Sequence, residues 1–245
     1  MAALVLVGGA CAATELPLFR MAPPIAPASR GALPLLPSGE RVLIDEGALR
    51  DYSQLGLGGR TWPSAATLCR WLADEGVLDG DESVLELGCG VGAVGCFAAA
   101  LEARRVTLTD GGSAALLQLA QRNVEANEPL WTGRASVRVL PLQWGGDVAK
   151  SIGVHTWIIG SDVTYSRESH GALCDTIAAQ LSATDGSRCV LAHEHRALAL
   201  GSFQGADERL GHFAKTAESR KLQLSILRTE QQRERDVSVV EVGLM

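Results

Sequence analysis

The chain has 245 residues, of which 47% are hydrophobic and 20% are charged, and its formal net charge is −6 at pH 7. These proportions are ordinary for a globular protein, so they exclude a globally disordered chain and a coiled coil. The acidic balance argues against nucleic-acid binding as the main activity, because that affinity comes largely from basic residues that meet phosphates.

The first 39 residues carry few signals of regular structure. Glu15 is the only acid among them, and five prolines between Pro23 and Pro37 argue against a helix. One interpretation is an organellar transit peptide, since such segments are poor in acids and contain arginine, whereas a secretory signal would begin with a charged stretch. We favour a poorly ordered extension over residues 1–39, followed by a single domain over residues 40–245. No apolar run approaches the roughly 20 residues that a membrane helix needs.

From about Ser38 onward, helix and strand signals alternate along the chain. Residues 41–44 predict a short strand and the glycine-rich residues 52–60 predict a loop. A helix is expected to begin at Trp62-Pro63-Ser64, since proline is tolerated in a first helical turn, and Ser113 is expected to cap a later one. In chain order, the sequence predicts helix 62–75, strand 83–87, helix 93–101, strand 105–110, helix 113–127, strand 137–140, strand 155–160, helix 169–181, strand 188–193, helix 203–220 and strands 222–227 and 237–242.

Strands separated by helices predict a Rossmann-like, doubly wound α/β fold with a mostly parallel sheet covered on both faces. The last two strands are joined only by the charged residues 228–236, which are too few for a crossover helix. These two strands should therefore pair antiparallel, giving seven strands with one reversed strand at the edge. Such a sheet binds ligands beyond the carboxyl ends of its strands.

The first chemical motif is Gly88-Cys89-Gly90-Val91-Gly92, which follows a buried strand and opens a helix. Glycines let a ligand approach the backbone closely, and the helix N-terminus offers free N–H groups to an anion. Asp110 ends the next strand, where its carboxylate can accept both hydroxyls of a ribose. These residues predict a ligand with an adenosine-like ribose and an anionic group.

The same glycines leave two cofactor classes open. Residues 90–95 fit G-x-G-x-x-G, the pattern of nicotinamide-dependent enzymes, which makes an NAD(P)-dependent oxidoreductase the formal alternative. Glu86, however, lies two residues before Gly88 and completes E-x-G-x-G-x-G, the pattern of S-adenosylmethionine (AdoMet) enzymes. A second mononucleotide-binding half is also not visible. We therefore predict AdoMet as the cofactor, with Glu86, Gly88, Cys89, Gly90 and Gly92 among the residues that bind it.

The second motif, Ser161-Asp162-Val163-Thr164-Tyr165, follows the fourth strand. Methyl transfer from a sulfonium needs a neutral nucleophile, whereas a lysine amine has an ordinary pKa of about 10.4 and arrives protonated. The Asp162 carboxylate would orient the ammonium and help to remove its proton, and the Tyr165 hydroxyl would steer the lone pair. The alternative is structural: Asp162 caps a turn and Tyr165 packs.

Two tryptophans complete the predicted site. Trp62 begins the first long helix, and Trp144 follows the third strand. Their aromatic faces can cover an adenine or flank a sulfonium through cation–π attraction. Packing is the alternative for both, as for most tryptophans.

Five motifs occur in an order that is typical of one family. They are Trp62-Pro63-Ser64, Glu86-Leu87-Gly88-Cys89-Gly90, Leu108-Thr109-Asp110, Gln143-Trp144-Gly145 and Asp162-Val163-Thr164-Tyr165. Over residues 43–245 the chain resembles methyltransferase family 16, the seven-strand protein-lysine methyltransferases. It departs from the family pattern at Gln143, where Asp is common, at Ser161, where Ala or Gly is commoner, and at Gly111-Gly112.

The resemblance implies AdoMet as methyl donor and a lysine of a non-histone protein as acceptor. It places Asp162 and Tyr165 on the substrate side, and it assigns cofactor contacts to Trp62, Gly88, Cys89, Gly90, Asp110, Trp144 and Ser161. We expect a cytoplasmic monomer that binds neither nucleic acid nor a membrane, with a plastid or mitochondrion as the alternative if residues 1–39 are a transit peptide. A small-molecule methyltransferase and an AdoMet-binding module without turnover are the other functional alternatives. Retention of the D-x-x-Y motif argues against the second.

Three further features are given structural interpretations. The six cysteines form no C-x-x-C pair, which excludes a zinc ribbon, and Cys89 has no evident base that would make it a nucleophile. His193-Glu194-His195 has the spacing of a metal-binding tripeptide but no evident third ligand, so we expect no metal site. The mixed charges of residues 228–235 predict a solvated turn.

Overall fold

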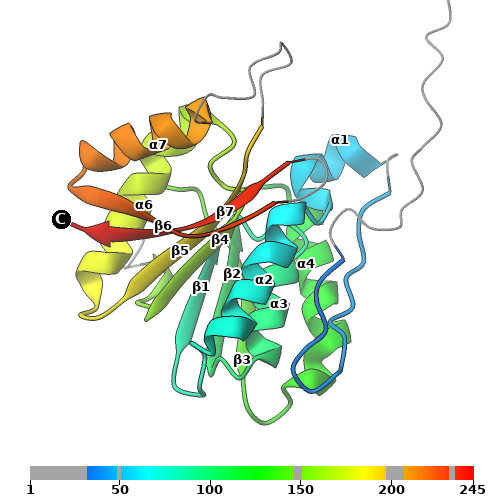
Figure 1. The fold of residues 1–245 in the computed structure, drawn as a ribbon. Helices are drawn as coiled ribbons and strands as arrows, with labels where there is room; N and C mark the ends of the chain where they lie inside the picture. The colour runs from blue at the N-terminus through cyan, green and yellow to red at the C-terminus, as the bar shows by residue number, and fades with distance from the viewer. Residues whose placement is uncertain (1–31, 49–50, 146–150, 197–206, 232–234) are drawn as a thin grey trace, which may run out of the picture.

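The alternating strands and helices build a seven-stranded sheet with helices on both faces (Figure 1). The computed structural model describes residues 32–48, 51–145, 151–196, 207–231 and 235–245, and every structural statement below concerns these residues. In sheet order the strands are β3 (Ser136–Pro141), β2 (Arg105–Asp110), β1 (Ser83–Leu87), β4 (Trp157–Ser161), β5 (Arg188–Glu194), β7 (Val237–Leu244) and β6 (Leu222–Glu230).

The predicted fold class is confirmed, and pairing in the sheet follows the expected mostly parallel pattern. Strands β3, β2, β1, β4 and β5 pair in parallel, whereas β7 pairs antiparallel with both β5 and β6. The reversed strand is thus β7, which lies one place inside the edge, and the edge strand is β6. The short connection between the last two strands forces their antiparallel pairing but does not decide which of them lies outermost.

The helices divide into two groups that cover opposite faces of the sheet (Figure 1). One group consists of α2 (Pro63–Glu75), α3 (Ala93–Ala100) and α4 (Ala114–Asn127), and the other of α6 (His170–Ala183) and α7 (Glu208–Glu218). Each group buries its own apolar cluster. Val84 of β1 belongs to the first cluster, whereas Leu85 and Leu87 belong to the second. This alternation follows from the two-residue period of a strand, and it leaves both faces of β1 buried.

Two expected helix starts are confirmed at the atomic level. Pro63 is the first residue of α2, after the extended backbone of Trp62. Ser113 caps α4, because its hydroxyl accepts a hydrogen bond from the Leu116 N–H at 3.2 Å. The predicted helix 203–220 is described from Glu208 as α7, and residues 203–206 lie outside the described part of the chain.

The strand predicted at residues 41–44 is not formed. This segment runs along α4, and its backbone groups bond to side chains instead of a neighbouring strand. The Asn127 amide accepts from the Leu43 N–H at 2.8 Å and donates to the Leu43 carbonyl, and the Asn123 amide pairs in the same way with Asp45. Leu33 and Leu36, inside the predicted extension 1–39, are buried in the first apolar cluster.

Two predicted loops contain regular structure. Residues 52–60 form one turn of helix, α1 (Tyr52–Leu55), followed by the 3-10 helix η2 (Gly56–Gly59). The positive φ of Gly56 ends the first turn. The charged stretch after residue 227 continues β6 to Glu230, because residues 228–230 pair with β7. Its charges are compensated by α2, since Arg228 pairs with Asp74 and Glu75 while Arg70 pairs with Glu230. Two short 3-10 helices, η3 (Glu128–Leu130) and η4 (Arg167–Ser169), precede β3 and α6.

In the described segments, no helix combines the length and the apolar character that crossing a bilayer requires.

Candidate cofactor and substrate site

A cavity of about 870 Å³ opens at the carboxyl ends of the parallel strands. The sheet order places β1 between β2 and β4, so this is the point at which the strand order reverses, where ligands bind in doubly wound sheets. The cavity is lined by ten of the eleven residues predicted for the site, namely Trp62, Glu86, Gly88, Cys89, Gly90, Asp110, Trp144, Ser161, Asp162 and Tyr165.

The glycine turn forms one wall of this cavity and needs glycine for conformational reasons. Gly88, Gly90 and Gly92 have φ values of +64°, +53° and +84°, a region that other residues rarely adopt. A side chain at Gly90 would also come within 2.7 Å of the Gly58 carbonyl oxygen. Gly92 is the predicted residue that does not line the cavity. It lies at the start of α3, where a side chain would come within 2.8 Å of Leu108 of β2, so close packing also requires glycine here.

Asp110 holds the glycine turn through its carboxylate. Its Oδ2 accepts a hydrogen bond from the Gly90 N–H at 2.9 Å, and its Oδ1 accepts one from the Gly112 N–H at 2.7 Å. A carboxylate has about four lone-pair sites, so these two bonds leave capacity to accept hydroxyl groups of a ligand. Asp110 therefore shapes the turn and faces the cavity at the same time.

Glu86 and Cys89 are buried on the same wall. Burial raises the pKa of Glu86 to about 8, against the opposing effect of a 2.9 Å hydrogen bond from the Gly95 N–H in the first turn of α3. Burial, reinforced by the nearby Glu86, raises the pKa of the Cys89 thiol well above its ordinary value. A thiol with a raised pKa stays protonated at neutral pH, which agrees with the packing interpretation of Cys89.

Two departures from the family pattern contact each other. The Gln143 amide donates a hydrogen bond to the Gly111 carbonyl oxygen at 2.8 Å. A side chain at Gly111 would lie about 3 Å from the Gln143 amide. The glutamine and the glycine after Asp110 are therefore a matched pair at the rim of the cavity. Next to Gln143, Trp144 packs on the glycine turn, since a side chain at Gly88 would come within 3.2 Å of its ring.

The D-x-x-Y motif turns sharply away from the end of β4. Asp162 has a φ of +54°, which is uncommon for a non-glycine residue and is found preferentially at functional sites. Its N–H still donates to the Ala192 carbonyl of β5 at 2.8 Å, and this hydrogen bond to the neighbouring strand fixes the backbone where the turn begins. The preceding residue, Ser161, shares a 2.8 Å hydrogen bond with Ser64 of α2. Tyr165 lines the cavity and is 43% exposed.

Arg196 is a residue of the cavity that the sequence did not single out. Its guanidinium forms an ion pair with the Asp162 carboxylate and lies 3.7 Å from Glu194. Burial raises the pKa of Asp162 to about 6, and the Arg196 charge opposes that rise. The available signal in the sequence was a basic residue two positions after β5, at the same sheet edge as Asp162. A single arginine at a strand end is too common to be chosen on that ground.

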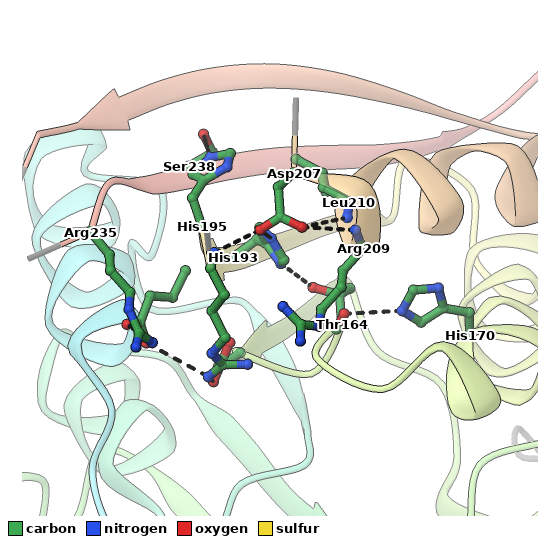
Figure 2. Close-up of polar contacts among 12 residues, drawn as sticks. Thr164, His170, His193, His195, Asp207, Arg209, Leu210, Arg235 and Ser238 are labelled. Carbon is green, nitrogen blue, oxygen red and sulfur yellow. Dashed lines mark hydrogen bonds and ion pairs between the residues drawn. The ribbon is translucent and has the colours of Figure 1, made fainter. Parts of the chain in front are cut away.

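The two histidines at the end of β5, His193 and His195, lie beside a carboxylate that the sequence did not identify. His193, His195 and Asp207 each offer one ligand atom, and these atoms all lie within 4.8 Å of one another (Figure 2). Asp207 is therefore a third candidate ligand, which was not evident in the sequence. The contacts form a polar network: His193 Nε2 lies 3.1 Å from Asp207 Oδ2, and His193 Nδ1 lies 2.6 Å from the Thr164 hydroxyl. The network thus ties the D-x-x-Y loop to the start of α7.

Comparison with known proteins shows that the chain is similar to lysine methyltransferases. A family model described as lysine methyltransferase matches residues 45–220. The protein N-lysine methyltransferase METTL21A of Xenopus tropicalis is 37% identical over 128 residues, 52% of this chain and 57% of that protein. The EEF1A lysine methyltransferase 3 of Mus musculus is 38% identical over 125 residues, 51% of each protein. The matched region spans little more than half the length of these curated relatives.

A solved structure shows the likeness of fold. The magnesium protoporphyrin IX methyltransferase ChlM from Synechocystis PCC 6803, with bound SAH, superposes with a TM-score of 0.54 at 17% identity. The superposition covers 82% of this chain and 90% of that one.

Proposed function

The chain belongs to the lysine methyltransferase family, and from this premise we propose that it transfers a methyl group from AdoMet to a lysine side chain of a non-histone protein. One observation carries the proposal. The glycine turn with Asp110, and the D-x-x-Y motif with Asp162 and Tyr165, line a single cavity although they come from different strands. A methyltransferase needs this arrangement, because the donor and the acceptor must meet at one point.

The residues of the cavity fit AdoMet. The Gly58 backbone leaves no room for a side chain at Gly90. A ligand at this turn would therefore contact the backbone itself and the N-terminus of α3. Asp110 retains lone pairs for ribose hydroxyls, and Trp62 and Trp144 offer aromatic faces. A volume of about 870 Å³ is within the usual range for small-molecule sites. We propose Trp62, Glu86, Gly88, Cys89, Gly90, Gly92, Asp110, Trp144 and Ser161 as the cofactor-binding set.

We propose Asp162 and Tyr165 as the groups that handle the acceptor. When bound, AdoMet would supply a methyl group on a sulfonium, whose carbon–sulfur electron pair would stay on sulfur. The acceptor ammonium must first give up a proton, so that the freed nitrogen lone pair can form the new carbon–nitrogen bond. At neutral pH and above, Asp162 is mostly ionised, since its pKa is about 6. Its carboxylate can therefore hold an ammonium and receive its proton, while the Tyr165 hydroxyl directs the nitrogen.

The compartment and the assembly are also part of the proposal. We infer a cytoplasmic monomer with a protein substrate, or a plastid or mitochondrial enzyme if residues 1–39 are a transit peptide. The cysteines within the described residues, Cys69, Cys89, Cys96, Cys174 and Cys189, are free thiols, which suits a reducing compartment. Light scattering after gel filtration would test the monomer, and imaging of the tagged chain would test the compartment.

Isotope-labelled AdoMet tests the function directly. The chain and an Asp162→Ala variant are each incubated with labelled AdoMet and a cell extract, and mass spectrometry locates the label. We expect label on a protein lysine, with loss of at least about a hundredfold in the variant, the usual contribution of a general base. Asp175→Ala, in an exposed ion pair with Arg220, is the matched control. Label confined to small molecules would contradict the lysine acceptor, and failure of the chain to bind AdoMet in calorimetry would contradict the proposal as a whole.

A further inference from the structure

The Asp162 carboxylate is closed off in this structure, although the proposed reaction needs it to meet an ammonium. Its side chain is only 5% exposed. The Arg196 guanidinium forms an ion pair with its Oδ2, and its Oδ1 is buried without a hydrogen-bond partner among the described residues. A substrate cation can therefore reach this carboxylate only if a group that now covers it moves.

Arg196 is the group in contact with Asp162, and its surroundings are those of a cation-binding position. The centre of its guanidinium lies 5.5 Å from the middle of the Trp62 ring and 6.0 Å from that of the Tyr165 ring. A carboxylate together with two aromatic faces attracts a positive charge of any kind. The same set of groups would suit the ammonium of a lysine.

We propose that Arg196 occupies the position of the substrate ammonium in the resting protein, and that the acceptor lysine displaces it from Asp162 onto Glu194. This inference rests on the proposed function and identifies the acceptor subsite. A lysine that enters must compete with a charge already held there. Arg196 is thus a specificity-determining residue, which admits a cationic acceptor and keeps neutral side chains out.

The structure contains a second position for the displaced guanidinium. Glu194 Oε2 lies 3.7 Å from the same Arg196 nitrogen, and it is buried without a hydrogen-bond partner in the described segments. The other oxygen of Glu194 pairs with Arg235 at 3.0 Å. After the exchange, each of the two carboxylates keeps a cation, so no buried charge is left uncompensated.

The backbone of Arg196 stays fixed during such an exchange. Its N–H donates a 2.7 Å hydrogen bond to Asp207 Oδ2, the carboxylate that also faces His193 and caps α7 (Figure 2). The movement is therefore confined to the long, flexible side chain.

The first experiment measures the subsite without AdoMet. The probe is n-butylammonium, which reproduces the end of a lysine side chain, and its affinity is measured by NMR titration. We expect Arg196→Ala to bind it about tenfold more tightly than the unmodified chain, since the change frees a buried carboxylate. Adding Asp162→Asn should abolish that gain. Arg70→Ala is the matched control, because Arg70 also pairs with a carboxylate but lies outside the cavity. Equal affinity in the unmodified and Arg196→Ala chains would overturn the inference.

The second experiment uses the protein as its own substrate. Arg196→Lys places an amine where the acceptor lysine is proposed to bind, so incubation with AdoMet should methylate residue 196, as seen by peptide mass spectrometry. Arg70→Lys should remain unmethylated at residue 70. If extract proteins are labelled but residue 196 is not, the inference is overturned and the proposed function stands. If calorimetry shows no AdoMet binding, the proposed function fails and the acceptor role fails with it. The butylammonium titration then decides separately whether Arg196 occupies a cation-binding position at Asp162.

Discussion

Two carboxyl groups on the cavity wall, Glu86 and Asp162, are both buried but have different hydrogen-bond and charge partners, and these partners give them different ionisation at neutral pH. Burial raises the pKa of both, to about 8 for Glu86 and to about 6 for Asp162. The Glu86 carboxyl group meets one backbone N–H, whereas the Asp162 carboxylate faces a guanidinium. A formal positive charge favours ionisation more than one backbone dipole does. Asp162 is therefore suited to handle a cation at neutral pH, and Glu86 to hold the start of α3 as a largely protonated acid.

Glu86 should make stability depend on pH. Between the ordinary value of 4.5 and about 8, the folded chain binds more protons at this residue than the unfolded chain does. The free energy of unfolding should then fall as pH rises through that window, by at most about 1.4 kcal/mol per pH unit. Glu86→Gln cannot ionise, so its stability relative to the unmodified chain should increase across the window and level off above it.

Urea unfolding from about pH 5 to about pH 9 measures this difference. Glu125→Gln, an exposed change on α4, is the control and should follow the unmodified chain. Parallel curves for Glu86→Gln and the unmodified chain would contradict the expected titration.

At the scale of elements, the polar network around Asp207 connects the end of β5 with the start of α7. The Asp207 carboxylate caps α7 by accepting from the Arg209 and Leu210 N–H groups, and it also faces His193 and holds the Arg196 backbone (Figure 2). Burial opposes ionisation, but these donors hold the pKa of Asp207 below its usual range. One side chain thus fixes two elements and the residue that covers Asp162.

Asp207→Ala should lower the free energy of unfolding by roughly 2–4 kcal/mol, the sum of a lost cap and a buried histidine left without its partner. Asp207→Asn should cost about half as much, because the amide oxygen can still cap the helix. Chemical denaturation gives both values. The exposed change Asp175→Ala should cost under about 1 kcal/mol. Equal losses for Asp207→Ala and Asp175→Ala would show that the network does not stabilise the chain.

At the scale of the whole molecule, the sequence predicted what local pattern determines and missed what distant side chains determine. The bounds of β1 were correct because a strand buried between two helix layers is rich in apolar residues, here Val84, Leu85 and Leu87. The strand expected at residues 41–44 was wrong because its pairing groups, Asn123 and Asn127, lie some eighty positions away. Arg196 was missed for the same reason, since its contact with Asp162 spans 34 residues. A glycine motif can be recognised from adjacent residues, whereas an ion pair between the ends of two strands cannot be predicted from the sequence around either residue.

Asn123 joins three parts of the molecule. Its amide group accepts from the Asp45 N–H at 2.9 Å, and it donates to the Asp45 carbonyl at 3.0 Å and to the Val91 carbonyl at 2.8 Å. Asp45 belongs to the segment along α4, and Val91 to the glycine turn that lines the cavity. A single buried side chain therefore couples the N-terminal segment of the domain to the proposed cofactor site.

Asn123→Ala should lower the free energy of unfolding by roughly 2–3 kcal/mol, because it leaves backbone groups without partners in a largely buried place. It should also weaken AdoMet binding in calorimetry, since the glycine turn loses a support, and it should expose residues 32–48 to limited proteolysis. Gln121→Ala, two residues earlier on the exposed face of α4, is the matched control for all three measurements. A stability loss without any change in AdoMet affinity would show that the segment stabilises the fold independently of the site.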